Sequence, residues 1–235
     1  MTRRLGLPAL LLLAACGASP DKAARPRDTD FPVPARAVAP IVSDRWSSEE
    51  ARDRLSEAGA VMDRAGILPG MTVADIGAGE GYYTVRLAAR VGPDGRVLAE
   101  DIVPAVRDRL AARVDRERLD NVSVRLGTPE DPKLPPDSFD RVLMVHMYHE
   151  IAAPYEFLWN VRPSLRKGGR LIIVDQDRDT VHHGTPPRLL DCELAAVGYV
   201  RVDRMKMPSA GGYLAAYEAR GPRPEPDAIR PCTGL

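Results

Sequence analysis

The sequence predicts an α/β protein whose sheet is mostly parallel and covered by helices on both faces. Short β-rich runs alternate with stretches of helical periodicity from about residue 47 to residue 219. Strands that are separated by helices imply crossover units, which connect parallel strands. The composition agrees with a globular domain, because 44% of the 235 residues are hydrophobic and 28% are charged.

The first elements follow in the order helix, strand, helix, strand, helix. Ser47 and Glu50 stand at capping-box spacing, and Gly66 ends the first helical period. Within that helix, apolar residues recur at Ala51, Leu55, Ala58, Met62 and Ala65. The next elements are a buried strand at 72–76, a helix at 83–91, a strand at 96–101, and a helix with an apolar stripe at Val103, Val106, Leu110 and Val114.

The second half of the chain continues the alternation and contains no internal repeat. Its elements are β-rich runs at 122–126, 141–146 and 170–175, an amphipathic helix at 155–165, a helix at 188–197, and runs at 199–204 and 213–219. We expect the last two runs to form an antiparallel pair.

A glycine-rich turn after the first strand is the main functional motif. Residues 73–81 read VADIGAGEG. Glycine lets the backbone turn tightly and lets a ligand lie directly against it, while the following helix offers unpaired N–H groups and a positive dipole end. Asp101 ends the second strand, where a carboxylate can accept hydrogen bonds from both ribose hydroxyls. The alternatives are a plain strand–helix turn for the glycines and a helix N-cap for Asp101.

The G-x-G-x-G pattern closely resembles the first motif of class I S-adenosylmethionine-dependent methyltransferases. The resemblance extends through 127–140 (GTPEDPKLPPDSFD) and 165–175 (LRKGGRLIIVD), and covers roughly residues 46–219. It implies a Rossmann-like, doubly wound sheet of seven strands, mostly parallel, with the last strand antiparallel.

The resemblance also implies roles for individual residues in binding S-adenosylmethionine. The glycines would cradle the amino-acid end of the cofactor, and the residues concerned are Gly77, Gly79 and Gly81. Asp75 would fix the turn, and Asp101 would hold the ribose. Glu100 is the neighbouring candidate, but strand alternation turns it to the other face.

One position departs from the family pattern. Many relatives have an aspartate directly after the glycine at position 127, and it contacts the adenine amino group. This chain has Thr128 and then Pro129, which lacks a backbone N–H. We therefore expect Glu130 or Asp131 to replace the adenine contact.

The HMYHE stretch at 146–150 follows the fourth strand, at the edge where open α/β sheets bind ligands. A group of uncharacterised bacterial methyltransferases that this chain resembles carries Tyr-His-Glu at this point. We expect His146, Tyr148 and His149 to face the methyl acceptor, where a neutral imidazole could remove a proton during transfer. Strand alternation would send His149 to the opposite side, unless the turn intervenes. The alternative for each histidine is a helix cap or a structural imidazole.

The four histidines of the chain are candidate metal ligands. His146 and His149 could flank the same cleft as His182 and His183, which leaves a metal site as an alternative. We expect no metal, because class I methyltransferases mostly lack one and no cysteine joins the set.

The first residues predict export and lipid anchoring. Arg3 and Arg4 precede a charge-free apolar run at 5–15, which as a helix covers about 16 Å, about half of a bilayer core. The sequence LAAC ending at Cys16 resembles the bacterial lipobox, whose cysteine is lipidated and becomes the mature N-terminus. The alternative is a buried N-terminal helix with an incidental cysteine.

This pattern divides the chain into four parts. We expect a lipoprotein signal peptide at 1–16, a Pro/Ala-rich tether at 17–45, a methyltransferase domain at 46–220 and a Pro-rich tail at 221–235. Cys192 and Cys232 could form a disulfide between the last helix and the tail outside the cytoplasm, and two free thiols are the alternative.

Taken together, these features predict a membrane-tethered S-adenosylmethionine-dependent methyltransferase of the bacterial cell envelope, on the periplasmic or outer-membrane side. Its acceptor is expected to be small or lipid-like. Basic and acidic residues number 33 each, which argues against nucleic acid as a partner. Because the cofactor is made in the cytoplasm, the enzyme would have to be exported already loaded. The alternatives are a non-catalytic binding module and a structural envelope lipoprotein on the same scaffold.

Overall fold

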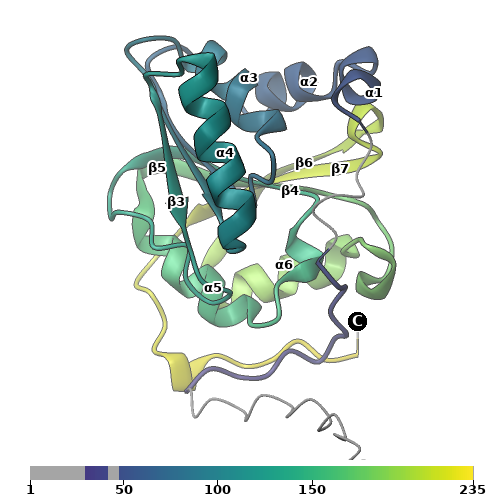
Figure 1. The fold of residues 1–235 in the computed structure, drawn as a ribbon. Coiled ribbons are helices and arrows are strands. Elements are labelled where there is room, and N and C mark those ends of the chain that lie inside the picture. The colour runs from purple at the N-terminus through teal and green to yellow at the C-terminus, as the bar shows by residue number, and fades with distance from the viewer. Residues whose placement is uncertain (1–29, 42–47, 235) are drawn as a thin grey trace, which may run out of the picture.

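The computed structural model describes residues 30–41 and 48–234, which form a seven-stranded sheet with helices on both faces (Figure 1). The strand order is β3-β2-β1-β4-β5-β7-β6. The first five strands pair in parallel, and β7 runs antiparallel to both β5 and β6. The strands are β1 (Thr72–Ile76), β2 (Arg96–Asp101), β3 (Val122–Leu126), β4 (Phe139–Val145), β5 (Leu165–Asp175), β6 (Tyr199–Met207) and β7 (Gly212–Ala219). This arrangement confirms the predicted Rossmann-like sheet with an antiparallel last strand.

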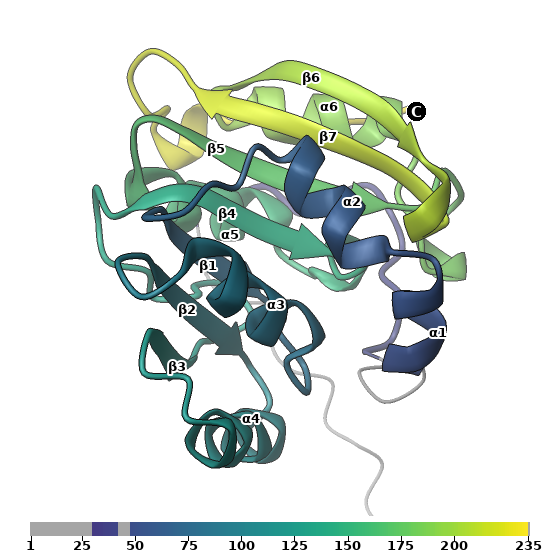
Figure 2. The ribbon, with the colours of Figure 1, turned by 90° about the horizontal axis from the view of Figure 1, so that it is seen from above.

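The α-helices form the two outer layers (Figure 2). Helices α2 and α3 pack on one face of the sheet, α5 and α6 pack on the other, and α4 lies against β2 and β3. The helices are α1 (Glu49–Arg54), α2 (Glu57–Arg64), α3 (Tyr82–Val91), α4 (Pro104–Glu117), α5 (Pro154–Val161) and α6 (Pro187–Ala196).

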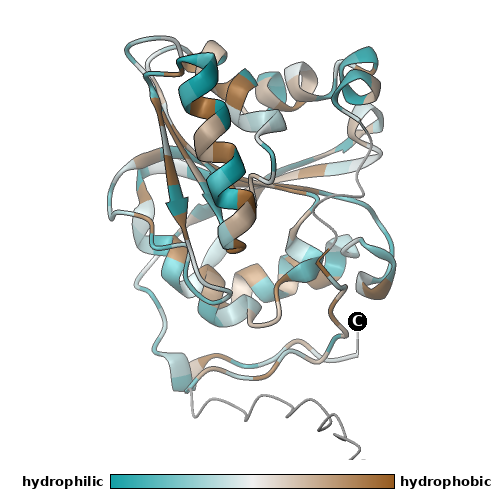
Figure 3. Ribbon diagram, in the orientation of Figure 1, coloured by the Kyte–Doolittle hydropathy of each residue, from teal (hydrophilic) through white to brown (hydrophobic). Residues whose placement is uncertain are grey.

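Alternate strand residues supply the two cores. In β1, Val73 packs toward α2 and α3 whereas Ala74 packs toward α5 and α6; Ile172 and Ile173 of β5 divide in the same way. All four side chains are buried, as expected for a sheet covered on both faces. Figure 3 shows the resulting concentration of hydrophobic residues in the strands.

The predicted first helix is divided in two. Ser56 lies between α1 and α2 with φ of 52°, in the left-handed region. Leu55, which the apolar stripe placed in the core, is 60% exposed. Ser48 accepts the hydrogen bond at the start of α1, and Ser47 lies outside the described residues. Because the chain bends at Ser56, α1 points in a different direction from α2. Helix α1 therefore lies near the carboxyl ends of β1, β2 and β4.

Both ends of the described chain pack on the α5–α6 layer. We call residues 30–41 the N-terminal strap and residues 221–234 the C-terminal tail. The strap forms an ion pair between Arg36 and Glu193 of α6, with 2.9 Å between Nε and Oε1. The indole of Trp159 in α5 contacts the ring of Phe31 and donates a hydrogen bond of 2.8 Å to the carbonyl of Pro224.

A disulfide joins the tail to α6. It links Cys192 to Cys232 across a sequence separation of 40. The described part of the expected tether, residues 30–41, also packs on the domain, so the folded unit begins before residue 46. The signal peptide with Cys16 and residues 17–29 lie outside the described residues. Within 30–41 and 48–234, no helix has the length and apolar character needed to span a membrane.

Candidate active site

A cavity of about 740 Å³ lies at the carboxyl ends of β1, β2 and β4. Strands β1 and β4 are neighbours, but the chain continues from β1 toward β2 and from β4 toward β5, so the sheet has its switch point here. Open α/β sheets bind ligands at such points. The wall is built from the glycine loop after β1, the residues at the end of β2, the turn after β4, and α1.

The three motif glycines have different surroundings. Gly77, Gly79 and Gly81 have φ of 65°, 58° and 92°, a region that side chains disfavour. A Cβ on Gly79 would meet no atom within 4 Å, whereas one on Gly81 would lie 2.5 Å from Cδ1 of Leu110 in α4. Gly77 and Gly79 line the cavity, but Gly81 does not. Gly81 was expected to cradle the cofactor, but it lies outside the cavity wall, where it allows α4 to pack closely against the loop.

Asp101 connects the glycine loop to the start of α4. Its Oδ2 accepts a hydrogen bond of 3.1 Å from the N–H of Gly79, and its Oδ1 accepts one of 2.9 Å from Val103, the N-cap position of α4. The residue is 6% exposed and lines the cavity. Its carboxylate thus stands at the cavity while it also fixes the loop, and Val103 rather than Asp101 is the N-cap residue of α4.

Glu100 also lines the cavity, contrary to the expectation from strand alternation. It is 1% exposed, and its Oε1 has no hydrogen-bond partner among the described residues. Burial, together with the neighbouring charge of Asp101, raises the pKa of Glu100 to about 8. Glu100 therefore presents a mostly protonated carboxyl group at neutral pH.

Asp75 stands behind the loop rather than in the cavity wall. Thr84 of α3 donates a hydrogen bond of 2.6 Å to its Oδ2, which ties β1 to α3 across the glycine turn. Burial raises the pKa of Asp75 to about 6. This position agrees with a role in holding the turn.

The turn after β3 does not place the expected acids in the cavity. Pro129 lines the wall, but Glu130 and Asp131 do not. The N–H of Asp131 donates to the carbonyl of Thr128, and the N–H of Thr128 donates to the carbonyl of Asp131, so the turn closes on itself. The predicted adenine contact by Glu130 or Asp131 is therefore not supported by their placement.

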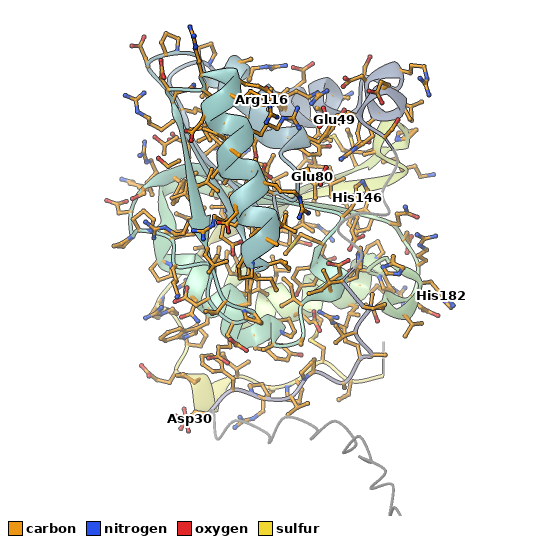
Figure 4. The ribbon with its side chains drawn as sticks, in the orientation of Figure 1. Asp30, Glu49, Glu80, Arg116, His146 and His182 are labelled. Carbon is orange, nitrogen blue, oxygen red and sulfur yellow. A yellow bond between two sulfur atoms is a disulfide. The ribbon has the colours of Figure 1, made fainter. Side chains whose placement is uncertain are left out.

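Of the three candidate catalytic residues, only His146 lines the cavity. His146, which is labelled in Figure 4, has φ of 56°, and its Nε2 lies 3.9 Å from Oε1 of Glu57. Burial lowers the pKa of His146 to about 4, so the imidazole is neutral at pH 7.

Tyr148 and His149 point away from the cavity. The 3-10 helix η1 (Tyr148–Glu150) turns the chain directly after β4, so strand alternation no longer applies. Tyr148 is fully buried and donates a hydrogen bond of 2.7 Å to Glu193. His149 is fully buried against Asp175, with 3.0 Å between Nδ1 and Oδ1. Both residues were expected to face the acceptor, and the structure corrects this; Glu150 lies in the wall instead.

Helix α1 contributes residues that no sequence motif indicated. Glu49 and Arg52 line the cavity beside the glycine loop. The guanidinium of Arg52 lies 3.8 Å from the ring centroid of Tyr82 and forms an ion pair of 2.6 Å with Glu57. Arg52 thus brings a fixed positive charge to the cavity. Arg52 reaches the cavity because the chain bends at Ser56, and no motif in the sequence predicts this bend.

Sequence comparison identifies a methyltransferase segment. Residues 74–173, somewhat less than half of the chain, match a family described as "Methyltransferase domain". The chain is 28% identical over 123 residues to the ubiquinone/menaquinone biosynthesis C-methyltransferase UbiE of Hahella chejuensis, and this match covers 51% of the chain and 48% of that protein. The chain spans about half or less of the length of the curated relatives it matches.

Two solved structures share the fold. A methyltransferase from Aquifex aeolicus, described as S-adenosylmethionine-dependent, has a TM-score of 0.62 at 21% identity, over 73% of this chain and 97% of that chain. The [4+2]-cyclase SpnF has a TM-score of 0.61 at 16% identity, over 81% of this chain and 89% of that chain. The chain thus shares a Rossmann-like fold with these proteins, and residues 74–173 are similar to a methyltransferase domain.

Proposed function

We propose that this protein transfers a methyl group from S-adenosylmethionine to an acceptor that binds in the same cavity. The observation that carries the proposal is the open backbone of Gly79, held by Asp101 at the edge of a cavity of about 740 Å³. That volume lies in the usual range for small-molecule sites. The match of residues 74–173 to a methyltransferase family points to the same chemistry.

The cavity residues fit the parts of the cofactor. The bare backbone at Gly77 and Gly79 suits the amino-acid end, with Arg52 near enough in the wall to attract its carboxylate. Asp101 would accept from the ribose hydroxyls, and Glu100 offers a buried carboxyl group with an unused oxygen. When bound, the cofactor supplies the electrophilic methyl group on its sulfonium.

The rest of the wall supports an acceptor with an apolar part. Ile151 and Phe157 contribute apolar side chains, and Glu150 adds a polar group. His146 is one residue in the wall that can receive a proton, since its imidazole is neutral at pH 7. Placing the acceptor in line with the methyl group and sulfur accounts for much of the acceleration. We therefore propose a small or lipid-like acceptor whose nucleophilic atom lies near His146.

We further propose that the protein works in the bacterial cell envelope, anchored to the membrane through a lipid on Cys16. The LAAC sequence supports the anchor. The disulfide between Cys192 and Cys232 supports an oxidising compartment, because disulfides are rare in the cytoplasm. Export with the cofactor already bound would provide S-adenosylmethionine there. Fatty-acid labelling of the wild type but not of Cys16→Ser in a bacterial host tests the anchor.

A second candidate function is binding without turnover. It is favoured by the closed turn at Thr128–Asp131, which leaves Pro129 as the only cavity contact among these four residues. The same fold in a [4+2]-cyclase also shows that fold alone does not fix the reaction. Binding of the cofactor combined with a lack of transfer to any apolar acceptor would favour this function.

Calorimetry with S-adenosylmethionine and S-adenosylhomocysteine tests the proposal. We expect both to bind the wild type, and we expect Asp101→Asn to weaken binding about 10- to 100-fold, because it removes hydrogen bonds to a charged group. Asp94→Asn is the matched control, since Asp94 is exposed at the opposite end of β2 and should leave affinity unchanged. The absence of binding by the wild type would overturn the proposal.

A further inference from the structure

A second cluster of polar groups lies behind the cavity wall. There η1 meets the 3-10 helix η3 (Thr180–His182), which belongs to the loop after β5. His149, Glu150 and His183 each offer one potential ligand atom, and these three atoms lie within 4.8 Å of one another. This cluster contains only two of the four histidines that the sequence offered as metal ligands. Of the other two, His146 faces the cavity and His182 is exposed at the outer edge (Figure 4).

His149 is held in one orientation by Asp175. The distance from Nδ1 to Oδ1 is 3.0 Å, and the carboxylate also accepts from the hydroxyl of Thr185 at 2.7 Å and from the N–H of Gln176 at 2.8 Å. A carboxylate accepts hydrogen bonds, so the proton of the imidazole belongs on Nδ1 and the lone pair on Nε2. This is the arrangement by which a carboxylate orients a metal-binding histidine.

Nε2 of His149 is a buried polar atom without a hydrogen-bond partner among residues 30–41 and 48–234. The side chain is fully buried. Leaving such an atom unsatisfied costs about 1–3 kcal/mol, so native proteins rarely do so without a reason. A bound ion on Nε2 would remove this cost.

His183 packs edge-on against His149. Its ring centroid lies 5.4 Å from that of His149, with 84° between the planes, and its buried Nδ1 also has no partner in the described part of the chain. The residue has φ of 59°, in the left-handed region that few residues other than glycine adopt. The loop that carries it is fastened to the strap, since Thr180 donates a hydrogen bond of 2.6 Å to the carbonyl of Ala37.

We propose that His149, Glu150 and His183 bind one divalent transition-metal ion, with Zn²⁺ as the preferred metal. Two imidazoles and one carboxylate form a common zinc ligand set that leaves a position open. Zinc ligands lie about 2.0–2.2 Å from the ion, so side-chain shifts of about 1 Å bring the three atoms onto it. Mg²⁺ and Ca²⁺ prefer oxygen ligands and are expected to bind poorly.

The proposed ion would border the cavity, because Glu150 belongs both to this cluster and to the cavity wall. Its open position would then accept an oxygen or nitrogen atom of a molecule in the cavity. The site stands on its own residues, so it does not depend on the proposed methyl transfer.

Calorimetric titration with ZnCl₂ tests the site. The protein is the full chain with its disulfide intact and with Cys16→Ser, so that no free thiol competes, after removal of metals with a chelator. We expect one Zn²⁺ per chain. His183→Asn is the informative variant, because asparagine tolerates the left-handed backbone but is a poor zinc ligand. It should weaken Zn²⁺ binding at least about 10-fold, as loss of groups that support a metal does.

His182→Asn is the matched control, since His182 is an exposed neighbour outside the cluster. It should leave Zn²⁺ affinity unchanged. Zn²⁺ should raise the melting temperature of the wild type and of His182→Asn, but not that of His183→Asn. Equal Zn²⁺ affinities of the two variants, or the absence of stoichiometric binding by the wild type, would overturn the proposal. Titration with S-adenosylhomocysteine in parallel distinguishes this outcome from failure of the proposed function.

Discussion

At the scale of single residues, Gly79 combines a positive φ of 58° with open space next to its Cα. Gly79→Ala would add a methyl group where the cofactor is expected to lie, so we expect affinity for S-adenosylhomocysteine to fall at least about 10-fold, which is about 1.4 kcal/mol. Backbone strain should lower the free energy of unfolding by about 1–2 kcal/mol. Calorimetry and urea denaturation measure the two effects.

Gly70→Ala provides the control for Gly79→Ala. Gly70 has φ of 82°, has open space at its Cβ position, and precedes β1 at the end away from the cavity. The free energy of unfolding of Gly70→Ala should fall by a similar amount, but its affinity for S-adenosylhomocysteine should stay unchanged. Equal losses of affinity in the two variants would contradict the assignment of Gly79 to the binding surface.

The raised pKa of Glu100 predicts that the free energy of unfolding depends on pH in an unusual way. Its folded pKa of about 8 lies above the ordinary 4.5, so the folded state keeps a proton that the unfolded state releases. The free energy of unfolding therefore falls as pH rises from about 4.5 to about 8. Glu100→Gln removes this contribution, so at pH 9 it should exceed the wild type by on the order of 4 kcal/mol, at about 1.36 kcal/mol per pKa unit.

Urea denaturation between pH 5 and pH 9 measures this effect. The gap between Glu100→Gln and the wild type should shrink toward pH 5, because that pH approaches the ordinary pKa of 4.5 at which the unfolded state also begins to bind the proton. Glu225→Gln, which changes an exposed glutamate, should follow the wild type throughout. A gap that is the same at all pH values would contradict the raised pKa.

The residues that the sequence placed correctly are those fixed by backbone geometry. Gly77, Gly79 and Asp101 line the cavity because a strand end and a tight turn determine their positions. Tyr148 and His149 were misplaced, because a 3-10 turn replaces strand alternation directly after β4. The turn is stabilised by the buried hydrogen bonds of Tyr148 with Glu193 and of His149 with Asp175. Both partners are far away in the sequence, so the local pattern does not predict the turn.

At the scale of elements, close packing of α4 on the glycine loop depends on Gly81. Gly81→Ala would place a methyl group 2.5 Å from Leu110, at φ of 92°. Overpacking and backbone strain should together lower the free energy of unfolding by about 2–4 kcal/mol. Gly59→Ala in α2 should instead raise it by up to about 1 kcal/mol, because that site has open space and alanine favours helices. Chemical denaturation of both variants checks the opposite signs.

The strands were predicted more accurately than the helices. The boundaries of β2 and β3 agree with the sequence, since turn residues directly precede both runs. The helix expected up to Gly66 breaks at Ser56, although its apolar residues continue at helical spacing. The break reflects tertiary contacts of α1, including the ion pairs of Glu49 with Arg113 and Arg86, which local periodicity does not contain.

At the scale of the whole molecule, the disulfide fastens the C-terminal tail to α6. Its loop spans 40 positions, so constraint of the unfolded chain should contribute on the order of 4 kcal/mol. Replacing Cys192 and Cys232 with serine should lower the free energy of unfolding by about this amount. Reductant should destabilise the wild type but leave the double variant unchanged, as measured by urea denaturation.

The packing of both chain ends was largely beyond sequence analysis. The strap is rich in proline and alanine and has no periodicity, so its composition predicts a tether. Its attachment depends on few contacts, chiefly Arg36 with Glu193 and the backbone of Ala39 with His149. These partners are more than a hundred residues away, and nothing in the local pattern identifies them.

Trp159 receives both ends of the chain. The ring of Phe31 lies 5.6 Å from it, the guanidinium of Arg223 lies 3.3 Å above it, and Pro224 accepts from its indole N–H. The sequence has only one other tryptophan, Trp46. With Trp46→Phe, the tryptophan fluorescence of the protein comes from Trp159 alone, so a change in this emission reports the release of either terminus.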